Sequence, residues 1–289
     1  MFQIIGIVVL FAMVFGSFII SGGKLAVILS ALPHELMAIG GAGVASFMIA
    51  NSLPVIKATG ANMKKVFGGP KWKPTDYRDL LSLLFLLTKT MKQKGVIALE
   101  SHIENPTESS VFTRFPSVMK DHFAVDFICD TLRMMTMNLE DPHQVEDAME
   151  NQLEKHHHES LQPSHALQSL ADALPALGIV AAVLGVIKTM GAITEPPEIL
   201  GEMIGGALVG TFLGVFLAYG LVGPMATRMK EVVEEELSFY KIIQSVLVAH
   251  LHGNAAQISV EIGRGNVPSE AQPSFLELEE ALSNIPNES

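Results

Sequence analysis

The chain has 289 residues, of which 49% are hydrophobic and 17% charged, so it is more apolar and poorer in charge than most soluble proteins. Its net charge of −11 argues against nucleic acid as a partner, because binding to phosphates requires a basic surface. The single cysteine, Cys129, excludes an intrachain disulfide, and we expect it to be a buried apolar side chain in a reducing compartment.

The first 23 residues carry no charge and predict a membrane span over residues 2–21. They lack the basic start of a cleaved signal peptide, so we expect this span to be retained. A polar hinge and the segment ALPHE, which ends at Glu35, then predict an outward-facing turn. The next uncharged run, residues 36–56, is long enough to cross a hydrocarbon core of about 30 Å and predicts a second span.

The segment 57–170 is expected to be the main aqueous domain. It is expected to consist of helices, because it lacks the sustained alternation of apolar and polar residues that is typical of strands. Its run LLSLLFLL, Leu80–Leu87, is too short for a span and predicts a buried helix. Amphipathic helices are predicted over 111–139 and 145–161. The run His156–His158 predicts a solvated helix face rather than a metal site, because consecutive helical residues diverge by about 100°.

Two further apolar runs, residues 172–191 and 203–227, predict a third and a fourth span. Small residues recur at every fourth position of the last run, namely Gly206, Gly210, Gly214 and Ala218. Residues at this spacing share one helix face. Small side chains on that face let a neighbouring helix approach closely in a membrane, so we expect a helix contact there.

Ionisable side chains lie only at the ends of these predicted spans: Asp172 at the inner mouth of the third and Lys188 at its outer end. Thr211 is the main polar side chain at depth. A path for protons or sodium generally needs an ionisable group within the membrane, so a partner chain is expected to supply the carboxylate. No phosphate loop, zinc-ligand spacing or nucleophile motif is present in the sequence. We therefore expect that the protein is not an enzyme and that it binds no metal or cofactor.

Basic residues gather after the second and fourth spans, which places both termini and the long middle segment in the cytoplasm. The expected domains are a first transmembrane pair (1–56), a cytoplasmic domain (57–170), a second transmembrane pair (171–228) and a cytoplasmic C-terminal part (229–289). The last part holds an amphipathic helix over 230–251 and an acidic tail expected to fray. The predicted fold is an all-α polytopic membrane protein with four transmembrane helices and a helical cytoplasmic domain.

Four long motifs resemble the MotA/PomA family of flagellar motor stator subunits: GVIALESHIENPTESSVF, DALPALGIVAAVLGVI, GALVGTFLGVFLAYGLVGPMA and PSFLELEEAL. They agree in order and spacing, and the resemblance covers nearly the whole chain. It implies an ion-channel and torque-generating subunit of the bacterial inner membrane. In that family five copies surround two copies of MotB, which carries the ion on a transmembrane aspartate and is anchored to peptidoglycan.

The resemblance also implies site residues. The family's two span-end prolines match Pro175 and Pro224, which we assign with Asp172, Thr211 and Ala182 to the ion pathway and its coupling. Proline removes a backbone donor and frees a carbonyl one turn back, so each could be a hinge or a static kink. Sodium-driven relatives tend to carry a threonine where this chain has Ala182. Its lack of a side-chain oxygen favours protons over sodium.

The family subunit engages the rotor protein FliG through charged residues of its cytoplasmic domain. The family glutamate matches Glu100, and the family arginine falls on Lys92, which keeps the charge but loses the bidentate fork. Lys94 could share that role. Three alternatives stay open at this point: a sodium-driven stator of the PomA type, an ion-driven energiser of the ExbB and TolQ kind, and a substrate transporter or passive membrane scaffold. Four spans speak against the energiser, and the lack of polar residues at mid-depth speaks against a transporter.

Overall fold

The computed structural model describes residues 2–137, 139 and 141–285, and this part of the chain is helical with no strand. The all-α fold class is therefore confirmed. The chain divides into two compact units. The first unit comprises Met1–Gly69 and Ser160–Val232, and the second comprises Pro70–Glu159 and Val233–Ser289.

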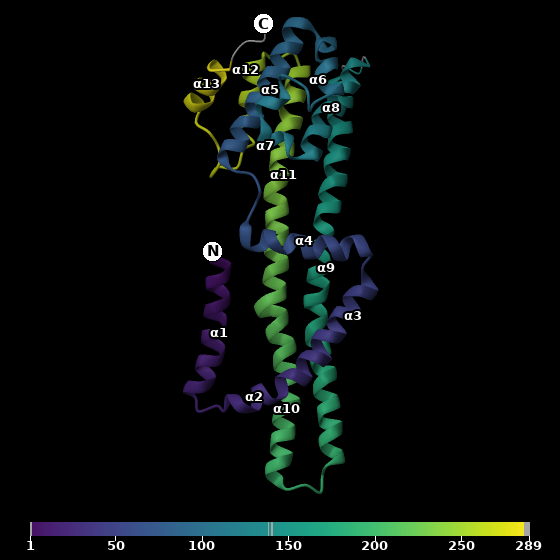
Figure 1. Cartoon of the computed structure of the whole chain (residues 1–289), viewed down its shortest axis with the longest axis vertical. Coiled ribbons are helices and arrows are strands. Elements are labelled where there is room, and N and C mark those ends of the chain that lie inside the picture. Colours follow the sequence, from purple (N-terminus) through teal and green to yellow (C-terminus); the bar gives the residue numbers. More distant parts are fainter. Residues whose placement is uncertain (1, 138, 140, 286–289) are drawn as a thin grey trace. The chain divides into compact units, whose positions relative to one another are not determined.

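The helices of the first unit are α1 (Phe2–Ile20), α2 (Leu25–Glu35), the π-helix η1 (Leu36–Gly40), α3 (Gly41–Ala50), α4 (Leu53–Gly68), the C-terminal part of α9 (Pro142–Gly191), α10 (Pro197–Val215), the π-helix η4 (Phe216–Val222) and the start of α11 (Gly223–Leu251) (Figure 1). Among the described residues, four helices are long and apolar enough to cross a membrane: Phe2–Ile20, Leu25–Ala50, Pro142–Gly191 and Pro197–Leu251. Such lengths and compositions are those of membrane helices.

The second apolar helix differs from its predicted bounds. It begins at Leu25 and ends at Ala50, whereas the sequence predicted a span over 36–56. The apolar segment before Pro33 continues the helix instead of forming a turn, and the chain leaves the helix at Asn51 with extended backbone angles (φ −124°, ψ 146°). As a consequence, Glu35 lies inside the helix rather than in an outward-facing turn.

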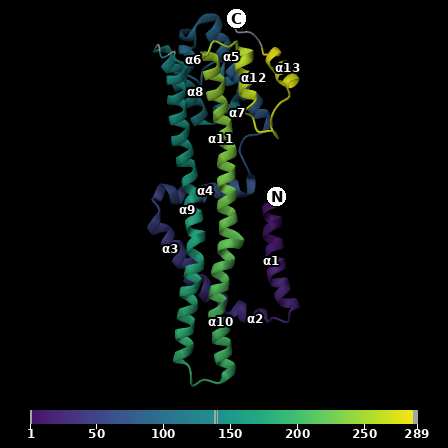
Figure 2. The ribbon, with the colours of Figure 1, turned by 180° about the vertical axis from the view of Figure 1, so that it is seen from behind.

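The other helices of the first unit lie around the α9–α10 pair (Figures 1 and 2). Small and aromatic side chains form the contacts between them. Phe15 of α1 contacts Phe212 of α10 edge to face, with ring centroids 6.1 Å apart. Gly43 of α3 faces α9, since a Cβ built there would lie 3.3 Å from a methyl group of Leu174. Val66 of α4 is buried in a small cluster with residues of α9 and α11. The apolar helices therefore form one packed group.

The second unit has its own hydrophobic core around α5 (Pro74–Lys94). Every residue from Leu80 to Leu87 is buried, which confirms the predicted buried helix. The other elements of this unit are η2 (Val96–Leu99), α6 (Glu100–Glu104), η3 (Phe112–Arg114), α7 (Pro116–Met119), α8 (His122–Thr136), the first part of α9, the last part of α11, α12 (Ala256–Arg264) and α13 (Phe275–Ser283).

The single helix predicted over 111–139 is wrong. Pro116 starts the short α7, and Asp121 then caps α8 by accepting a hydrogen bond of 2.8 Å from the backbone N–H of Ala124. An aspartate at this position ends one helical segment and begins the next, because its carboxylate satisfies a free N–H of the new first turn. The helices predicted over 145–161 and 230–251 instead belong to the longer α9 and α11.

The C-terminal tail is also more ordered than expected, because it forms α12 and α13, both of which pack on α5. Val260 of α12 is fully buried and Leu278 of α13 is 3% exposed. Ser274 and Glu277 form a capping box at the start of α13, with each side chain bonding the other's backbone N–H. These two short amphipathic helices are not predicted from the sequence, because the tail is mostly polar.

Candidate ion pathway and rotor-facing surface

The backbones of α9 and α10 are in direct contact. A Cβ built on Gly214 would lie 2.6 Å from the carbonyl oxygen of Leu174 and 2.9 Å from the Cα of Gly178. A Cβ built on Gly178 would in turn lie 2.8 Å from the carbonyl oxygen of Gly210. No side chain fits at such distances, so the two backbones touch directly, as small residues allow in membrane helices.

The stripe of small residues on α10 also faces α2. A Cβ on Gly206 would be in ordinary contact with Ala31, at 3.9 Å, whereas one on Gly210 would lie 2.5 Å from Oε2 of Glu35. The same Cβ would lie 3.3 Å from Ala181 of α9. Farther along the stripe, Ala218 is fully buried. The predicted stripe of α10 therefore contacts α2 on one side and α9 on the other, and all three helices meet at Gly210.

Glu35 is a candidate site residue that the sequence alone does not reveal. The predicted spans held no ionisable group at depth, but the structure places this carboxyl within the helix Leu25–Ala50 and against Gly210. Its Oε2 is buried and has no hydrogen-bond partner among the described residues. The length of the apolar run from Leu25 could have revealed it, had the pair of polar residues before Leu36 not indicated a turn.

Pro175 and Pro224 lie on neighbouring stretches of backbone. Pro175 is half-buried inside α9, and Pro224 is exposed at the start of α11, directly after the π-helix η4. A Cβ on Gly223 would lie 4.0 Å from that of Ala171, so the chain just before each proline touches the other. Gly223 donates to a carbonyl five residues back, at Ala218, so the hydrogen-bond register changes where Pro224 offers no donor.

The remaining predicted pathway residues lie in different surroundings. Asp172 is exposed and accepts a hydrogen bond of 2.8 Å from Nε2 of Gln168, one turn back. Thr211 and Ala182 are half-buried and follow Gly210 and Ala181 in the chain. They therefore lie at the level of Glu35, whereas Asp172 does not. The structure brings Glu35 together with Gly210 of the predicted stripe, places Thr211 and Ala182 at a similar level of their helices, and leaves Asp172 closer to the prolines.

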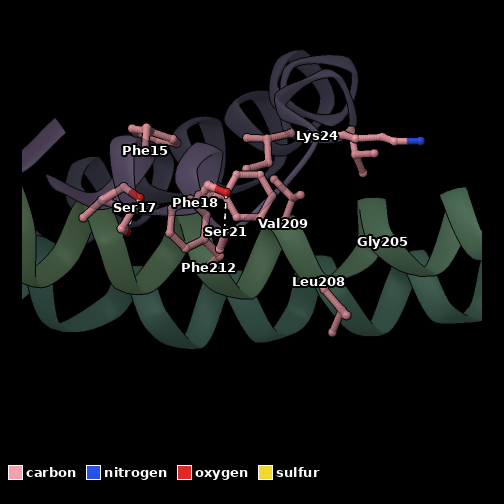
Figure 3. A pocket seen from close by; sticks show the side chains of 12 residues that line it. Phe15, Ser17, Phe18, Ser21, Lys24, Gly205, Leu208, Val209 and Phe212 are labelled. Carbon is pink, nitrogen blue, oxygen red and sulfur yellow. Dashed lines mark hydrogen bonds between the residues drawn. The ribbon is translucent and has the colours of Figure 1, made fainter. Parts of the chain in front are cut away.

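An apolar groove of about 750 Å³ lies between α1, α2 and α10 (Figure 3). Its polar side chains are few, and the hydroxyls of Ser17 and Ser21 already donate to carbonyls of their own helix, at 3.0 and 2.8 Å. Phenylalanine rings and aliphatic side chains supply the rest of its wall, with Lys24 at one end. The groove therefore offers hydrocarbon contacts and does not provide oxygen ligands for an ion.

The predicted rotor-facing residues belong to the second unit and are all exposed. Lys92 and Lys94 lie in the last turn of α5, and Glu100 begins α6 after a sharp bend at Gly95, whose φ is +82°. Nζ of Lys92 approaches the carbonyl oxygen of Gly253 at 3.4 Å, a long and weak hydrogen bond. These charges therefore contribute little to the fold and are accessible to a partner.

Other candidates in the second unit are structural. Cys129 is buried, and burial raises the pKa of its thiol to about 12, so the reactive thiolate is absent at neutral pH. His156 stacks on Phe123 with ring centroids 3.6 Å apart, so the predicted solvated face is wrong for this residue. Among the described residues no group of three or more histidines, cysteines or carboxylates could hold a metal ion.

Comparison with known proteins agrees with this architecture. The solved structure "Structure of C. jejuni MotAB" matches 94% of this chain and 98% of its own with a TM-score of 0.71 at 20% sequence identity. The family description "Motility protein A N-terminal" matches residues 4–95, and "MotA/TolQ/ExbB proton channel family" matches residues 120–241. The chain is 37% identical to "Motility protein A" of Escherichia coli (strain K12), over 99% of this chain and 97% of that protein. The chain belongs to the MotA family.

This family membership confirms the resemblance and the expectations of a membrane channel subunit without enzymatic activity. Another relative, "Chemotaxis protein LafT" of Vibrio parahaemolyticus serotype O3:K6, is 34% identical over 97% of this chain and 98% of its own length. The MotA family consists of membrane channel proteins and not of enzymes, as expected. The description "MotA/TolQ/ExbB proton channel family" indicates that an ion is transported. The stretch matched by the proton channel family contains the prolines, the small-residue stripe and Ala182, while Glu35 lies in the stretch matched by the N-terminal family.

Proposed function

We propose that this protein is the ion-channel and torque-generating subunit of a flagellar motor stator. In this role it couples proton flow, through a complex with a MotB-type partner, to rotation of the rotor. The observation that carries the proposal is the 37% identity to a motility protein A along almost the whole chain. Four apolar helices of membrane length and a separate polar unit supply the channel part and the force-transmitting part.

The partner and the oligomer are proposed from the exposed faces of the apolar helices. Large aliphatic residues of α9 point outward from the single chain, among them Ile179, Val183 and Ile187, each more than 50% exposed. Lipid, other copies of the chain or a partner's transmembrane helix must cover such faces. Two solved structures similar in fold contain MotAB, and one of them, from Bacillus subtilis, is described as a flagellar stator complex. In the proposed complex, five copies of this chain surround two MotB-type chains, whose aspartate carries the ion. Contacts between these chains would cover the exposed faces.

The proposed location is the bacterial inner membrane, with both termini in the cytoplasm. The helix α4, which follows the second apolar helix, carries the basic residues Lys57, Lys64 and Lys65. In the turns that join the helices of each pair, the only basic residue is Lys24. This asymmetry follows the positive-inside rule. The second unit, Pro70–Glu159 with Val233–Ser289, is then the cytoplasmic domain, with bounds somewhat narrower than the segment 57–170.

Torque is proposed to pass to FliG through Lys92, Lys94 and Glu100, whose exposure supports a contact with charges on another protein. Pro175 and Pro224 are proposed to couple protonation on the partner to movement of α9 and α11. Ala182 supports protons as the ion, because a hard sodium ion would gain no side-chain oxygen at this position. Asp172 and Thr211 are proposed to line the route near the prolines and near Glu35, respectively.

A deletion and complementation experiment tests the proposal. Removing the gene from a strain with no other stator genes should leave flagellar filaments in place but abolish swimming, and expression of the chain with its partner should restore it. Normal swimming of the deletion strain would contradict the proposal. An energiser of the ExbB and TolQ kind would instead leave swimming intact and impair energy-dependent uptake across the outer membrane.

A further inference from the structure

The carboxyl of Glu35 is an ionisable group that the proposed function does not use. Along the apolar helices of the described chain, α1 carries no charge and α9 carries none from Ala173 to Ile187. The stretch from Met203 in α10 through η4 to Thr227 in α11 carries none either. Only His34, which is exposed, and Glu35 interrupt the helix Leu25–Ala50. An ionisable side chain in a membrane helix is costly, and for this reason it usually marks an ion or proton path.

Glu35 lies in the outer part of the apolar helices, on the side where α1 ends. Phe15 of α1 contacts Phe212 of α10 edge to face, and Phe11 contacts Phe216 in the same way. The two helices therefore run side by side, and Gly210, two residues before Phe212, lies level with the last turn of α1, which ends at Ile20. This level is near the extracytoplasmic boundary of the hydrocarbon core that α1 crosses.

Two features that cost stability accommodate this carboxyl. Gly210 has no side chain where any Cβ would lie 2.5 Å from Oε2 of Glu35, although glycine weakens a helix. The π-helix Leu36–Gly40 begins at the residue after Glu35, and such insertions into α-helices often occur at functional sites. Departures from the most stable local choices are expected where function requires them.

Glu35 forms no ion pair among the described residues. Its Oε2 is buried without a hydrogen-bond partner in this part of the chain and lies against Gly210 of α10. The nearest titratable groups along the packed helices are exposed: His34 on its own helix, Glu202 and Tyr219 at eight and nine residues from Gly210, and Lys188 at seven residues beyond Ala181. Because Oε2 is buried without a donor, the charged carboxylate is disfavoured relative to the neutral acid.

We propose that Glu35 is protonated in the resting subunit and is a proton-exchange site of this chain on the route to the partner's aspartate. The inference rests on the proposed function. Glu35 releases its proton toward the partner and takes up another from the extracytoplasmic side, so the carboxyl is regenerated in each cycle. The subunit thus supplies a titratable group of its own, in addition to the group supplied by the partner.

The test uses the complete complex with its partner, reconstituted in liposomes under an imposed pH gradient. The variants are Glu35→Gln, Glu35→Asp and the control Glu198→Gln, which changes an exposed carboxylate in the first turn of α10. Glu35→Gln should reduce proton flux about tenfold or more, since a positioned proton donor contributes at least that much to a transfer step. It should also change the dependence of flux on extracytoplasmic pH. Glu35→Asp should keep most of the flux, and Glu198→Gln all of it.

Infrared difference spectra of the same samples report protonation directly. The spectrum of the wild-type complex minus that of Glu35→Gln should contain one carboxylic-acid C=O band, which belongs to Glu35 because the carboxyls of the partner are common to both samples, while native mass spectrometry shows equal assembly. Wild-type flux with an unchanged pH profile in Glu35→Gln would overturn the inference. Loss of flux accompanied by loss of assembly in both Glu35 variants would assign the residue to packing and also overturn it. A wild-type complex that conducts no ions would contradict the proposed function instead, and the infrared band would still decide the state of Glu35.

Discussion

Gly178 of α9 and Gly214 of α10 are packed backbone against backbone, and a Cβ built on Gly214 would lie 2.9 Å from the Cα of Gly178. Contact at this distance leaves no room for any side chain larger than hydrogen. The relative position of the two helices therefore depends on glycine at both residues, and so does the alignment of the other elements that pack on them.

Gly214→Leu should separate α9 from α10 and impair assembly before it affects conduction. Forcing a side chain into a closely packed site costs about 1–3 kcal/mol or more, and here the backbone itself must move. Native mass spectrometry should show dissociated subunits, and swimming should be lost. Gly16→Leu is a matched control, because a Cβ on Gly16 meets nothing within 4 Å. An intact oligomer with normal torque in Gly214→Leu would show that this contact is dispensable.

Pro175→Ala and Pro224→Ala should leave insertion and assembly unchanged but lower torque. Alanine restores a backbone donor and relieves a clash with the preceding turn, so helix stability should hold or increase. Membrane levels, oligomer content and single-motor torque are measured on the same strains. If the prolines only set static packing, assembly should weaken first and torque should fall in proportion to it. Normal torque in both variants would remove the prolines from the mechanism.

Lys92→Glu and Glu100→Lys should each impair swimming without lowering the amount of protein in the membrane. Both side chains are exposed, and the contact of Lys92 with Gly253 is too long to contribute much stability. Opposite charge reversals on FliG should restore part of the swimming speed, as complementary charges require. Lys155→Glu, which reverses an exposed charge of α9, is the control. The absence of rescue by any opposite charge would assign Lys92 and Glu100 to an ordinary solvated surface.

Asp121 should make the stability of the second unit sensitive to acid. Burial alone would raise the pKa of its carboxyl, but hydrogen bonds from Lys71, from the backbone of Ala124 and from Tyr240 hold that pKa below its usual value. A carboxyl with a depressed folded pKa stabilises the fold above its unfolded pKa of about 3.9. The contribution is lost as the pH falls through the lower, folded pKa.

Asp121→Asn should therefore lower the unfolding temperature at pH 7 and make no difference at strongly acidic pH. We expect a loss of about 1–2 kcal/mol at pH 7, because Lys71 is partly exposed and solvent screens the pair. The only tryptophan of the chain, Trp72, stacks on Phe239 beside Lys71, so its fluorescence follows this region. Asp126→Asn, on the exposed face of α8, is the control. An equal loss at all pH values would show that the ionised form of Asp121 contributes nothing.

Much of this architecture could be predicted from the sequence, because long apolar runs and helical periodicity are strong local signals. The buried helix Leu80–Leu87 and the apolar runs of α9 and α10 follow directly from composition. The stripe from Gly206 to Ala218 indicated a close helix contact. Its neighbours could not be predicted, since the sequence does not tell which helix lies against which face of α10.

The errors arose where tertiary packing outweighs local polarity. A proline, a histidine and a carboxylate in succession are typical of loops and predict a turn at Glu35, yet the apolar surroundings keep the helix intact. The tail after Gly253 was expected to fray because of its polar composition. Val260 and Leu278, however, are buried against α5, which fixes two short helices that would not be stable alone.

The proposed function requires that protons cross the membrane through this subunit together with its partner. It is tested most directly by measuring ion flux in liposomes that contain the chain alone or the chain with its MotB-type partner, from which any periplasmic plug has been removed. A pH gradient should drive flux only in the complex, and a sodium gradient at constant pH should drive none. Strong proton flux through the chain alone, or flux driven by sodium alone, would contradict this account.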